Sequence, residues 1–173
     1  MLLASLVLFL AAVNLQPLGD PSARAVVLLF TRTDCPISNR YAPEIKRVYE
    51  AYAKQGVQFY LVYPDRDETA AAIEKHRSEF GYPMPAVQDL AHEWVARAHA
   101  SVTPEAAVFV PAGKHEWRLV YHGRIDDRYI DFGKSRREPS VHDLQNAIDA
   151  ALAGRKVAQA ETKAIGCFIA DLR

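Results

Sequence analysis

Six consecutive apolar residues, followed by a short polar link and then a helical pattern, constrain this chain more than any other feature. The apolar run is Ala25–Phe30, the link is Thr31–Asp34, and Cys35 and Pro36 open the helical pattern. Such a run is typical of a buried strand. Proline suits the first helical turn, where the backbone N–H has no partner anyway. The sequence therefore predicts a buried strand that delivers Cys35 to the N-terminus of a helix.

Apolar side chains recur at intervals of three and four residues after Cys35, which indicates one amphipathic helix. Gly56 marks its end, and Pro43 lies inside it, where it removes one backbone hydrogen bond and predicts a kink. The apolar positions are Ile37, Tyr41, Ile45, Val48, Tyr49 and Tyr52.

The rest of the chain continues the alternation of strand and helix patterns, which predicts an α/β layer structure. Residues 116–122 should pair antiparallel with the strand before them, across a turn at 111–114. Ser140, with Asp143 three residues later, can cap the last helix, and the long polar connection 123–139 is a candidate for a functional segment. The predicted strands are 57–63, 106–110 and 116–122, and the predicted helices are 69–80, 90–99 and 140–153.

Three segments are expected along the chain: residues 1–24, a domain over 25–153, and a tail over 154–173. Met1–Val13 is apolar except for Ser5, too short for a transmembrane helix but about the length of a signal-peptide core. The segment can equally be a buried strand or helix of the domain. We favour export, to the periplasm or beyond, over a cytoplasmic location, and we expect no stable membrane span.

The charge balance and the cysteine count exclude several classes of protein. Lys plus Arg and Asp plus Glu are both 21, so a strongly basic nucleic-acid-binding surface is not expected. Two cysteines, Cys35 and Cys167, are too few for a disulfide scaffold and too far apart in sequence for a zinc motif. They can still meet in space.

Cys35 has the position of a reactive thiol. A helix N-terminus offers unpaired amide donors and the positive end of the helix dipole, which favour thiolate over thiol. Asp34 acts in the opposite direction. A free cysteine is also often just a small buried apolar side chain, so Cys35 alone does not decide between the two interpretations.

Taken together, these residues resemble the thioredoxin-fold superfamily, in particular extracytoplasmic thioredoxin-like and redoxin-domain proteins of the AhpC/TSA type. Cys35 opens the helix as the first cysteine of a Cys-x-x-Cys motif does, and Pro43 stands eight residues later, as in thioredoxins. Thr103-Pro104 before an apolar strand is similar to the family segment whose proline is cis and faces the active cysteine. The resemblance covers roughly residues 25–153 and implies a central mixed β-sheet flanked by helices.

The chain departs from that pattern at Ser38, which stands where a thioredoxin has its second cysteine. A hydroxyl can stabilise a neighbouring thiolate, but it cannot attack a mixed disulfide. Cys35 can therefore act as a monothiol, act as a peroxidatic thiol, or be resolved by Cys167. A tail of about 14 residues at up to ~3.3 Å per residue can reach the active-site rim. Cys167 can also be an apolar anchor or a disordered tail residue.

Three alternatives to thiol–disulfide exchange are open at this point. The first is a thiol peroxidase, an interpretation that is weakened because Arg32 and Leu28 replace the threonine and proline of the peroxiredoxin pattern Pro-x-x-x-Thr-x-x-Cys. Copper binding would need both cysteines and a histidine, since soft thiolates suit Cu(I). The third alternative is a non-catalytic binding module. The candidate histidines are His92, His99 and His122.

We interpret the chain as a thioredoxin-like thiol oxidoreductase that exchanges disulfides with protein or low-molecular-weight thiols. Neither a bound organic cofactor nor a metal is expected. The candidate catalytic residues are Cys35, Ser38 and Cys167, and the candidate substrate-binding residues are Thr103, Pro104 and Pro36.

Overall fold

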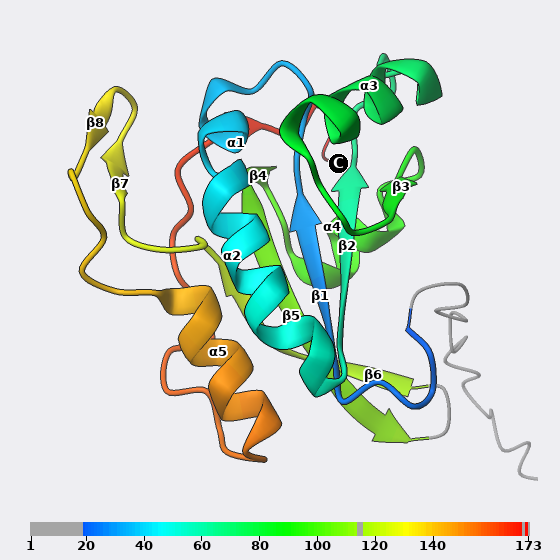
Figure 1. Ribbon diagram of the computed structural model, residues 1–173, viewed down its shortest axis with the longest axis vertical. Coiled ribbons are helices and arrows are strands. Elements are labelled where there is room, and N and C mark those ends of the chain that lie inside the picture. Colours follow the sequence, from blue (N-terminus) through cyan, green and yellow to red (C-terminus); the bar gives the residue numbers. More distant parts are fainter. Residues whose placement is uncertain (1–18, 114–115, 171, 173) are drawn as a thin grey trace, which may run out of the picture.

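The computed structural model describes residues 19–113, 116–170 and 172. A five-stranded sheet, ordered β3-β2-β1-β5-β6, forms its centre (Figure 1). β1 pairs parallel with β2 and antiparallel with β5, β2 pairs parallel with β3, and β5 pairs antiparallel with β6. The strands are β1 (Ala25–Phe30), β2 (Val57–Tyr63), β3 (Ala86–Gln88), β5 (Glu105–Gly113) and β6 (Glu116–Gly123). The predicted mixed α/β sheet is confirmed.

Alternate residues of β1 face two separate apolar clusters, one on each side of the sheet. Val27 and Leu29 belong to the cluster that includes buried residues of α2 and α5, whereas Leu28 and Phe30 belong to the cluster that includes α4. All six β1 residues are buried, as the unbroken apolar run predicts. The helices are α1 (Pro36–Arg40), α2 (Ala42–Tyr52), the 3₁₀ helix η1 (Ala53–Gln55), α3 (Ala70–Phe80), α4 (Glu93–Ala98) and α5 (Asp143–Leu152).

The helix expected from Cys35 to Gly56 is divided into two α-helices and a 3₁₀ turn, where we predicted one kinked helix. Tyr41 ends α1, and its amide donates to the carbonyls of Ile37 and Ser38. Pro43 then occupies the first turn of α2, where a missing N–H costs nothing. Proline therefore starts a new helix here and does not bend an existing one. Gly56, in the left-handed conformation (φ 85°), ends η1 as expected.

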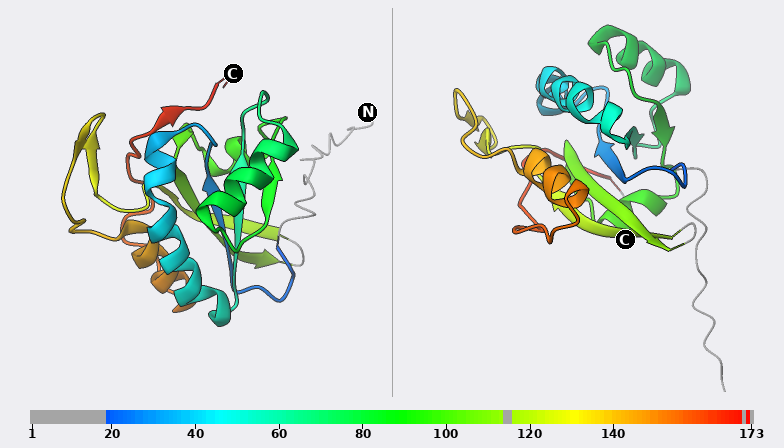
Figure 2. Two further views of the ribbon diagram at one scale, coloured as in Figure 1. Left: turned by 45° about the horizontal axis from the view of Figure 1, so that its top comes forward. Right: turned by 60° about the horizontal axis from the view of Figure 1, so that its bottom comes forward.

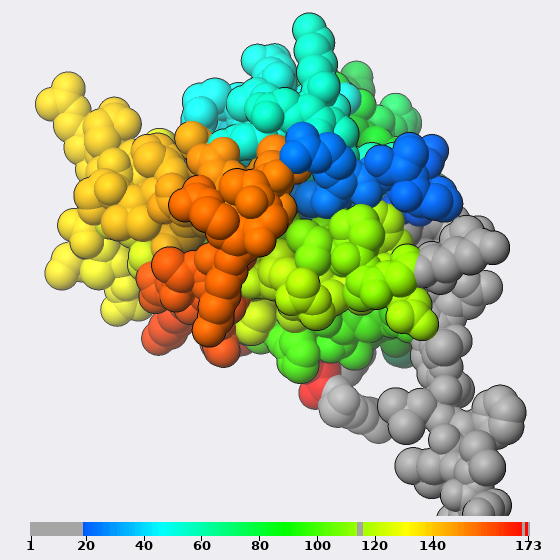
Figure 3. All heavy atoms as spheres, turned by 90° about the horizontal axis from the view of Figure 1, so that it is seen from below, coloured from blue at the N-terminus to red at the C-terminus, as the bar shows by residue number. Residues whose placement is uncertain are grey.

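One other local prediction needs correction. Ser140 does not cap α5: its hydroxyl and amide bind the carboxylate of Asp127, and His142 occupies the N-cap position. The connection 123–139 contains a small hairpin, β7 (Tyr129–Asp131) and β8 (Lys134–Ser135), which projects from the body of the protein (Figures 1 and 3).

Two predicted features are not described in full. The first is the turn expected at 111–114. Its first three residues belong to β5, which continues to Gly113, and Lys114 lies outside the described residues. The apolar segment Met1–Val13 lies outside them as well. Within the described parts of the chain, no helix combines the length and apolar character that crossing a membrane requires.

The C-terminal tail returns from α5 to the end of the sheet where β1 meets α1 (Figures 1 and 2). There β9 (Cys167–Phe168) pairs antiparallel with β4 (Val102–Thr103), the short strand directly before Pro104. The tail is packed on the domain over much of its length, because Val157, Thr162 and Ile169 are all buried.

Candidate functional site

Cys35 is the N-cap residue of α1, directly after the loop that follows β1. Its backbone is extended (φ −82°, ψ 109°), and its carbonyl accepts the amide of Asn39 in the first helical turn. Pro36 occupies the exposed first position of the helix. The Cys35 side chain is fully buried, so its sulfur is not open to solvent in this arrangement.

The loop before β5 lies against Cys35. The Thr103–Pro104 peptide bond is cis, and the Cys35 thiol donates to the Thr103 carbonyl with an Sγ–O distance of 3.1 Å. Glu105 holds the preceding segment by hydrogen bonds, since one of its carboxylate oxygens accepts the amides of Ser101 and Val102. This carboxylate is itself buried. The segment that leads into this loop is therefore fixed by hydrogen bonds to a buried carboxylate.

The second cysteine reaches the same point from the tail. Cys167 is paired with Thr103 in the β4–β9 register, and its thiol donates to Cys35 with a sulfur–sulfur distance of 2.7 Å. Both cysteines are free thiols, although they are 132 positions apart in the sequence. Cys167 is partly exposed, whereas Cys35 beneath it is not. The structure thus brings the two candidate cysteines into direct contact.

Gly166 makes this approach sterically feasible. A Cβ atom at position 166 would lie 2.1 Å from the Thr103 carbonyl oxygen and 3.0 Å from the Pro104 nitrogen. Real Cβ atoms do not approach backbone so closely, and backbone of a buried loop cannot move aside as a flexible side chain can. Any larger residue would separate β9 from β4. The sequence suggested that Gly166 gives the backbone before Cys167 freedom, but it did not reveal this close approach to the Thr103 carbonyl.

A second anchor holds the tail upstream of β9. The Thr162 hydroxyl accepts the amide of Arg124 at 3.0 Å and lies 2.7 Å from the Tyr121 hydroxyl, which donates to the Arg124 carbonyl. Gly123, with φ 140°, leaves space for this contact, because a Cβ there would lie 2.2 Å from the Thr162 carbonyl oxygen. This anchor too was not predicted from the sequence.

The pKa values of the two thiols are shifted in opposite directions. Burial would raise the pKa of Cys35, but contacts with the Cys167 thiol and with the side chain and amide of Ser38 outweigh burial and lower it. Burial, the hydrogen bond to Cys35 and the charge of Cys35 raise the pKa of Cys167 to about 12, although Arg32 opposes this rise. Cys35 is therefore the more acidic of the two thiols, and it loses its proton before Cys167 does.

Ser38, at the position of a second motif cysteine, is fully buried in α1. Among the described residues its hydroxyl has no partner at regular hydrogen-bond geometry, yet it lies close enough to help lower the pKa of Cys35. Only the thiol form of Cys35 can donate to the Thr103 carbonyl, so that contact opposes ionisation. The serine and the carbonyl thus act on the thiol in opposite directions.

The histidines considered for copper binding have contacts of their own. His92 Nε2 is 2.9 Å from the Pro64 carbonyl oxygen, and the rings of His99 and His122 lie 5.6 Å apart. In the described residues, the side chains that could together surround a metal are of another kind and include no cysteine: Glu44, Asp126 and His142. The geometry therefore does not assemble the predicted combination of two cysteines and a histidine there.

The Glu44, Asp126 and His142 group is already compensated by two arginines. Arg47 donates to both carboxylate oxygens of Glu44, and Arg128 Nε lies 4.0 Å from Asp126. A bound cation would have to compete with both guanidinium groups.

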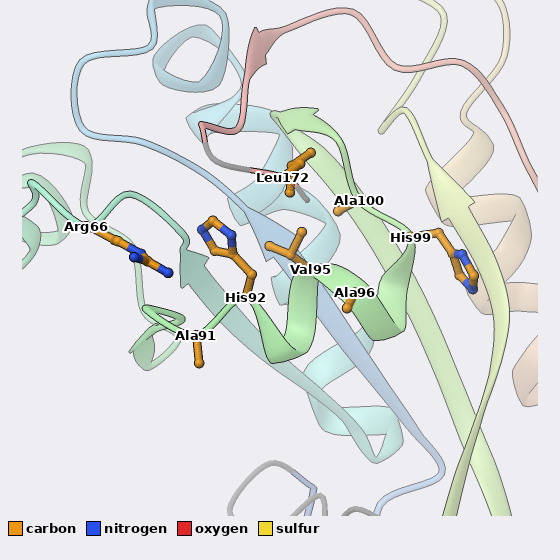
Figure 4. Close-up of a pocket in the computed structure, with 8 residues that line it drawn as sticks. All are labelled: Arg66, Ala91, His92, Val95, Ala96, His99, Ala100 and Leu172. Carbon is orange, nitrogen blue, oxygen red and sulfur yellow. The ribbon is translucent and has the colours of Figure 1, made fainter.

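A cavity of about 690 Å³ lies along α4 (Figure 4). Neither cysteine lines it. Its lining residues are Arg66, Ala91, His92, Val95, Ala96, His99, Ala100 and Leu172.

The chain matches the family model described as AhpC/TSA family over residues 11–116. This region contains Cys35, Ser38 and Pro104 and ends before Cys167. Among curated proteins, no match is found.

Solved structures with the same fold include two that have no assigned function. A hypothetical protein from Sinorhizobium meliloti 1021 has 26% identity and a TM-score of 0.72, covering 86% of this chain and 80% of its own. An uncharacterized conserved protein from Geobacillus kaustophilus has 26% identity and a TM-score of 0.71, covering 88% and 80%.

A third structure, from Chlorobium tepidum, carries the description 'putative Thiol:disulfide interchange protein DsbE'. It has 16% identity and a TM-score of 0.56, covering 76% of this chain and 82% of its own. The fold is thioredoxin-like, as the resemblance implied.

Proposed function

Because the chain belongs to the AhpC/TSA family, we propose that it is a two-cysteine thiol–disulfide oxidoreductase in which Cys35 and Cys167 cycle between dithiol and disulfide. One observation carries this proposal: the two sulfur atoms, 132 positions apart in sequence, lie 2.7 Å from each other. A disulfide needs an S–S distance of about 2.05 Å, so only a small movement separates contact from a bond.

Cys35 is the nucleophile in this proposal, because its pKa is lowered while that of Cys167 is raised. The Cys35 thiolate attacks one sulfur of a substrate disulfide, forms a mixed disulfide and releases the other sulfur as a thiolate. Cys167 then attacks the Cys35 sulfur, which releases the second substrate thiolate and leaves the Cys35–Cys167 disulfide. Two electrons pass from the protein to the substrate disulfide, and no bound organic cofactor is needed.

The order of the two attacks follows from electrostatics. The charge on Cys35 is one of the causes that raise the pKa of Cys167. When Cys35 becomes part of a mixed disulfide, that charge disappears and the Cys167 pKa falls. Cys167 then loses its proton more easily, and the departing substrate thiolate can take it up. Cys167 is thus protected as a thiol until Cys35 has reacted.

The remaining predicted residues have positioning roles in this scheme. Ser38 lowers the pKa of Cys35. Thr103 and Pro104 form the surface against which the bound strand lies, and Pro36 starts α1 at an exposed position beside the nucleophile. Protein disulfides and low-molecular-weight disulfides are the expected substrates.

The test compares single-cysteine variants during oxidation by glutathione disulfide, with intact and peptide mass spectrometry. Cys167→Ser should accumulate one glutathione on Cys35, whereas the wild-type protein should release glutathione and close its internal disulfide. Cys35→Ser should react much more slowly than Cys167→Ser. If Cys35 stays unmodified in Cys167→Ser while a control thiol reacts, the proposal is wrong.

A parallel reaction with hydrogen peroxide distinguishes the two kinds of substrate. The Cys35 thiolate would then form a sulfenic acid with loss of hydroxide, and Cys167 would attack it with loss of water. A reaction with peroxide much faster than that of an ordinary thiol, together with a slow reaction with disulfides, would replace disulfide exchange with peroxidase activity.

A further inference from the structure

β9 is bound at the active site in the manner of an extended peptide. Thr103 is paired with Cys167 and Val102 with Phe168, antiparallel, and the Ile169 amide donates to the Ser101 carbonyl at 3.1 Å. The central residue of this segment is a cysteine whose sulfur contacts Cys35. The segment Ile165–Ile169 therefore has the arrangement that a substrate cysteine would need for attack by Cys35.

The position before the cysteine admits only glycine. The obstacle is steric, since a Cβ atom at 166 would lie 2.1 Å from the Thr103 carbonyl oxygen. Gly166 does not have a positive φ, so alanine would be acceptable there for the backbone conformation itself. A bound segment with any side chain at this position would collide with the loop that carries Pro104.

The two positions after the cysteine have different surroundings. Phe168 is 75% exposed, so the position directly after the cysteine makes little contact with the domain. Ile169 is only 5% exposed and belongs to the apolar cluster that includes Val95 and Ala98 of α4. This alternation is that of a strand with one face on the protein. It favours an aliphatic residue two positions after the cysteine.

From these contacts we propose that the β4 edge binds an extended segment of a partner polypeptide in which glycine directly precedes the reacting cysteine and an aliphatic residue stands two positions after it. The protein's own β9 occupies this edge and competes with the partner segment for it. The inference rests on the proposed function, because the partner cysteine enters as one half of a disulfide. Cys35 thiolate bonds to the partner's cysteine sulfur, and the other sulfur of that disulfide leaves as a thiolate.

A partner can bind only when β9 leaves β4, because Cys35 is fully buried beneath it. The anchor at Thr162 can stay in place during this step, since its partners are Tyr121 of β6 and Arg124 directly after β6, and neither belongs to β4. A tethered segment competes at an effective concentration of the order of millimolar. The tail therefore excludes short or poorly fitting peptides and gives way to those that bind β4 well.

The experiment uses the full-length protein with two substitutions, Gly166→Ala and Cys167→Ser, which displace β9 and remove the competing thiol. Peptides are supplied as mixed disulfides with 5-thio-2-nitrobenzoate, and the released chromophore reports the attack by Cys35. Three peptides are compared: Ile-Gly-Cys-Phe-Ile, Ile-Ala-Cys-Phe-Ile and Ile-Gly-Cys-Phe-Asp. The mixed disulfide of glutathione with the same chromophore measures the intrinsic reactivity of Cys35. If this variant does not fold, Ile169→Asp with Cys167→Ser replaces it.

The glycine peptide with the terminal isoleucine should react about ten- to a hundredfold faster than the alanine peptide, as expected for one overpacked methyl group. The peptide that ends in aspartate should also react more slowly than the one that ends in isoleucine, because its last side chain would enter the apolar cluster that Ile169 occupies. Equal rates for all three peptides, with a reactive Cys35 toward the glutathione reagent, would overturn the proposed selectivity and leave the redox function intact. No reaction with any reagent would overturn the proposed function and the selectivity with it.

Discussion

The substitution Gly166→Ala tests the structural basis of the cysteine pair, because it adds one carbon where the structure leaves no space. The new Cβ would lie 2.1 Å from the Thr103 carbonyl oxygen. Neither β9 nor the loop at Pro104 can absorb this overlap without moving. We expect β9 to detach from β4 while Thr162 still holds the upstream part of the tail.

The magnitude follows from the contacts that β9 loses. Ile169 is 5% exposed, and burial of such a side chain contributes ~1.5–3 kcal/mol. The hydrogen bond from the Ile169 amide to the Ser101 carbonyl contributes ~0.5–1.5 kcal/mol more. A loss of about 2–4 kcal/mol would lower the population of the docked tail by about 30- to 800-fold.

The assay is the equilibrium between the Cys35–Cys167 pair and a series of glutathione redox buffers, quenched with acid and read by mass spectrometry. The effective concentration of Cys167 at Cys35 should fall with the docked population, by about 30-fold or more, in Gly166→Ala. Ala170→Gly, a change of one carbon at an exposed position of the same tail, is the matched control and should leave it unchanged. An unaltered equilibrium in Gly166→Ala would refute the argument that this close approach needs glycine.

Three further predictions concern the acidity of the thiols and the second anchor. Ser38→Ala should raise the pKa of Cys35, and its alkylation rate at pH 7 should fall, because the Ser38 hydroxyl helps to lower that pKa; an unchanged rate profile between pH 5 and 10 would contradict this role. Cys35→Ser should bring the pKa of Cys167 down from about 12, since the thiolate charge that helps to raise it is gone. The measurement is the pH dependence of Cys167 alkylation, and a midpoint unchanged from the wild type would contradict the prediction. Thr162→Val should expose the tail to limited proteolysis and lower the free energy of unfolding by ~1–3 kcal/mol, because it leaves the Arg124 amide without its acceptor and removes one of the two contacts of the Tyr121 hydroxyl. Resistance equal to that of the wild type would mean that the Thr162 hydroxyl is not needed to hold the tail.

The parts of the fold that could be predicted depend on neighbours in the sequence. The apolar run Ala25–Phe30 is buried in the sheet, and Cys35 is the N-cap of α1, as local pattern and helix-terminus chemistry indicate. The break at Tyr41 was missed because a proline pattern does not distinguish a kink from a new helix start. Ser140 was assigned to the wrong partner because the buried carboxylate of Asp127 competes for it from another loop.

The parts that could not be predicted depend on distant backbone. From the sequence we could expect only that the tail is long enough to bring Cys167 to the active site. The place of Cys167 opposite Thr103 is set by strand pairing across 64 positions. The need for Gly166 appears only when the Thr103 carbonyl is present beside it. The raised pKa of Cys167 likewise results from Cys35, which no local pattern near residue 167 reveals.

The most direct test of the central claim is the mass of the wild-type protein after one equivalent of glutathione disulfide has reacted with the fully reduced chain. We predict a loss of two hydrogens with no glutathione retained, and one tryptic fragment in which the Cys35 peptide is linked to the Cys167 peptide. A stable glutathione adduct on Cys35 in the wild-type protein, with Cys167 still free, would contradict the assignment of Cys167 as the partner of Cys35.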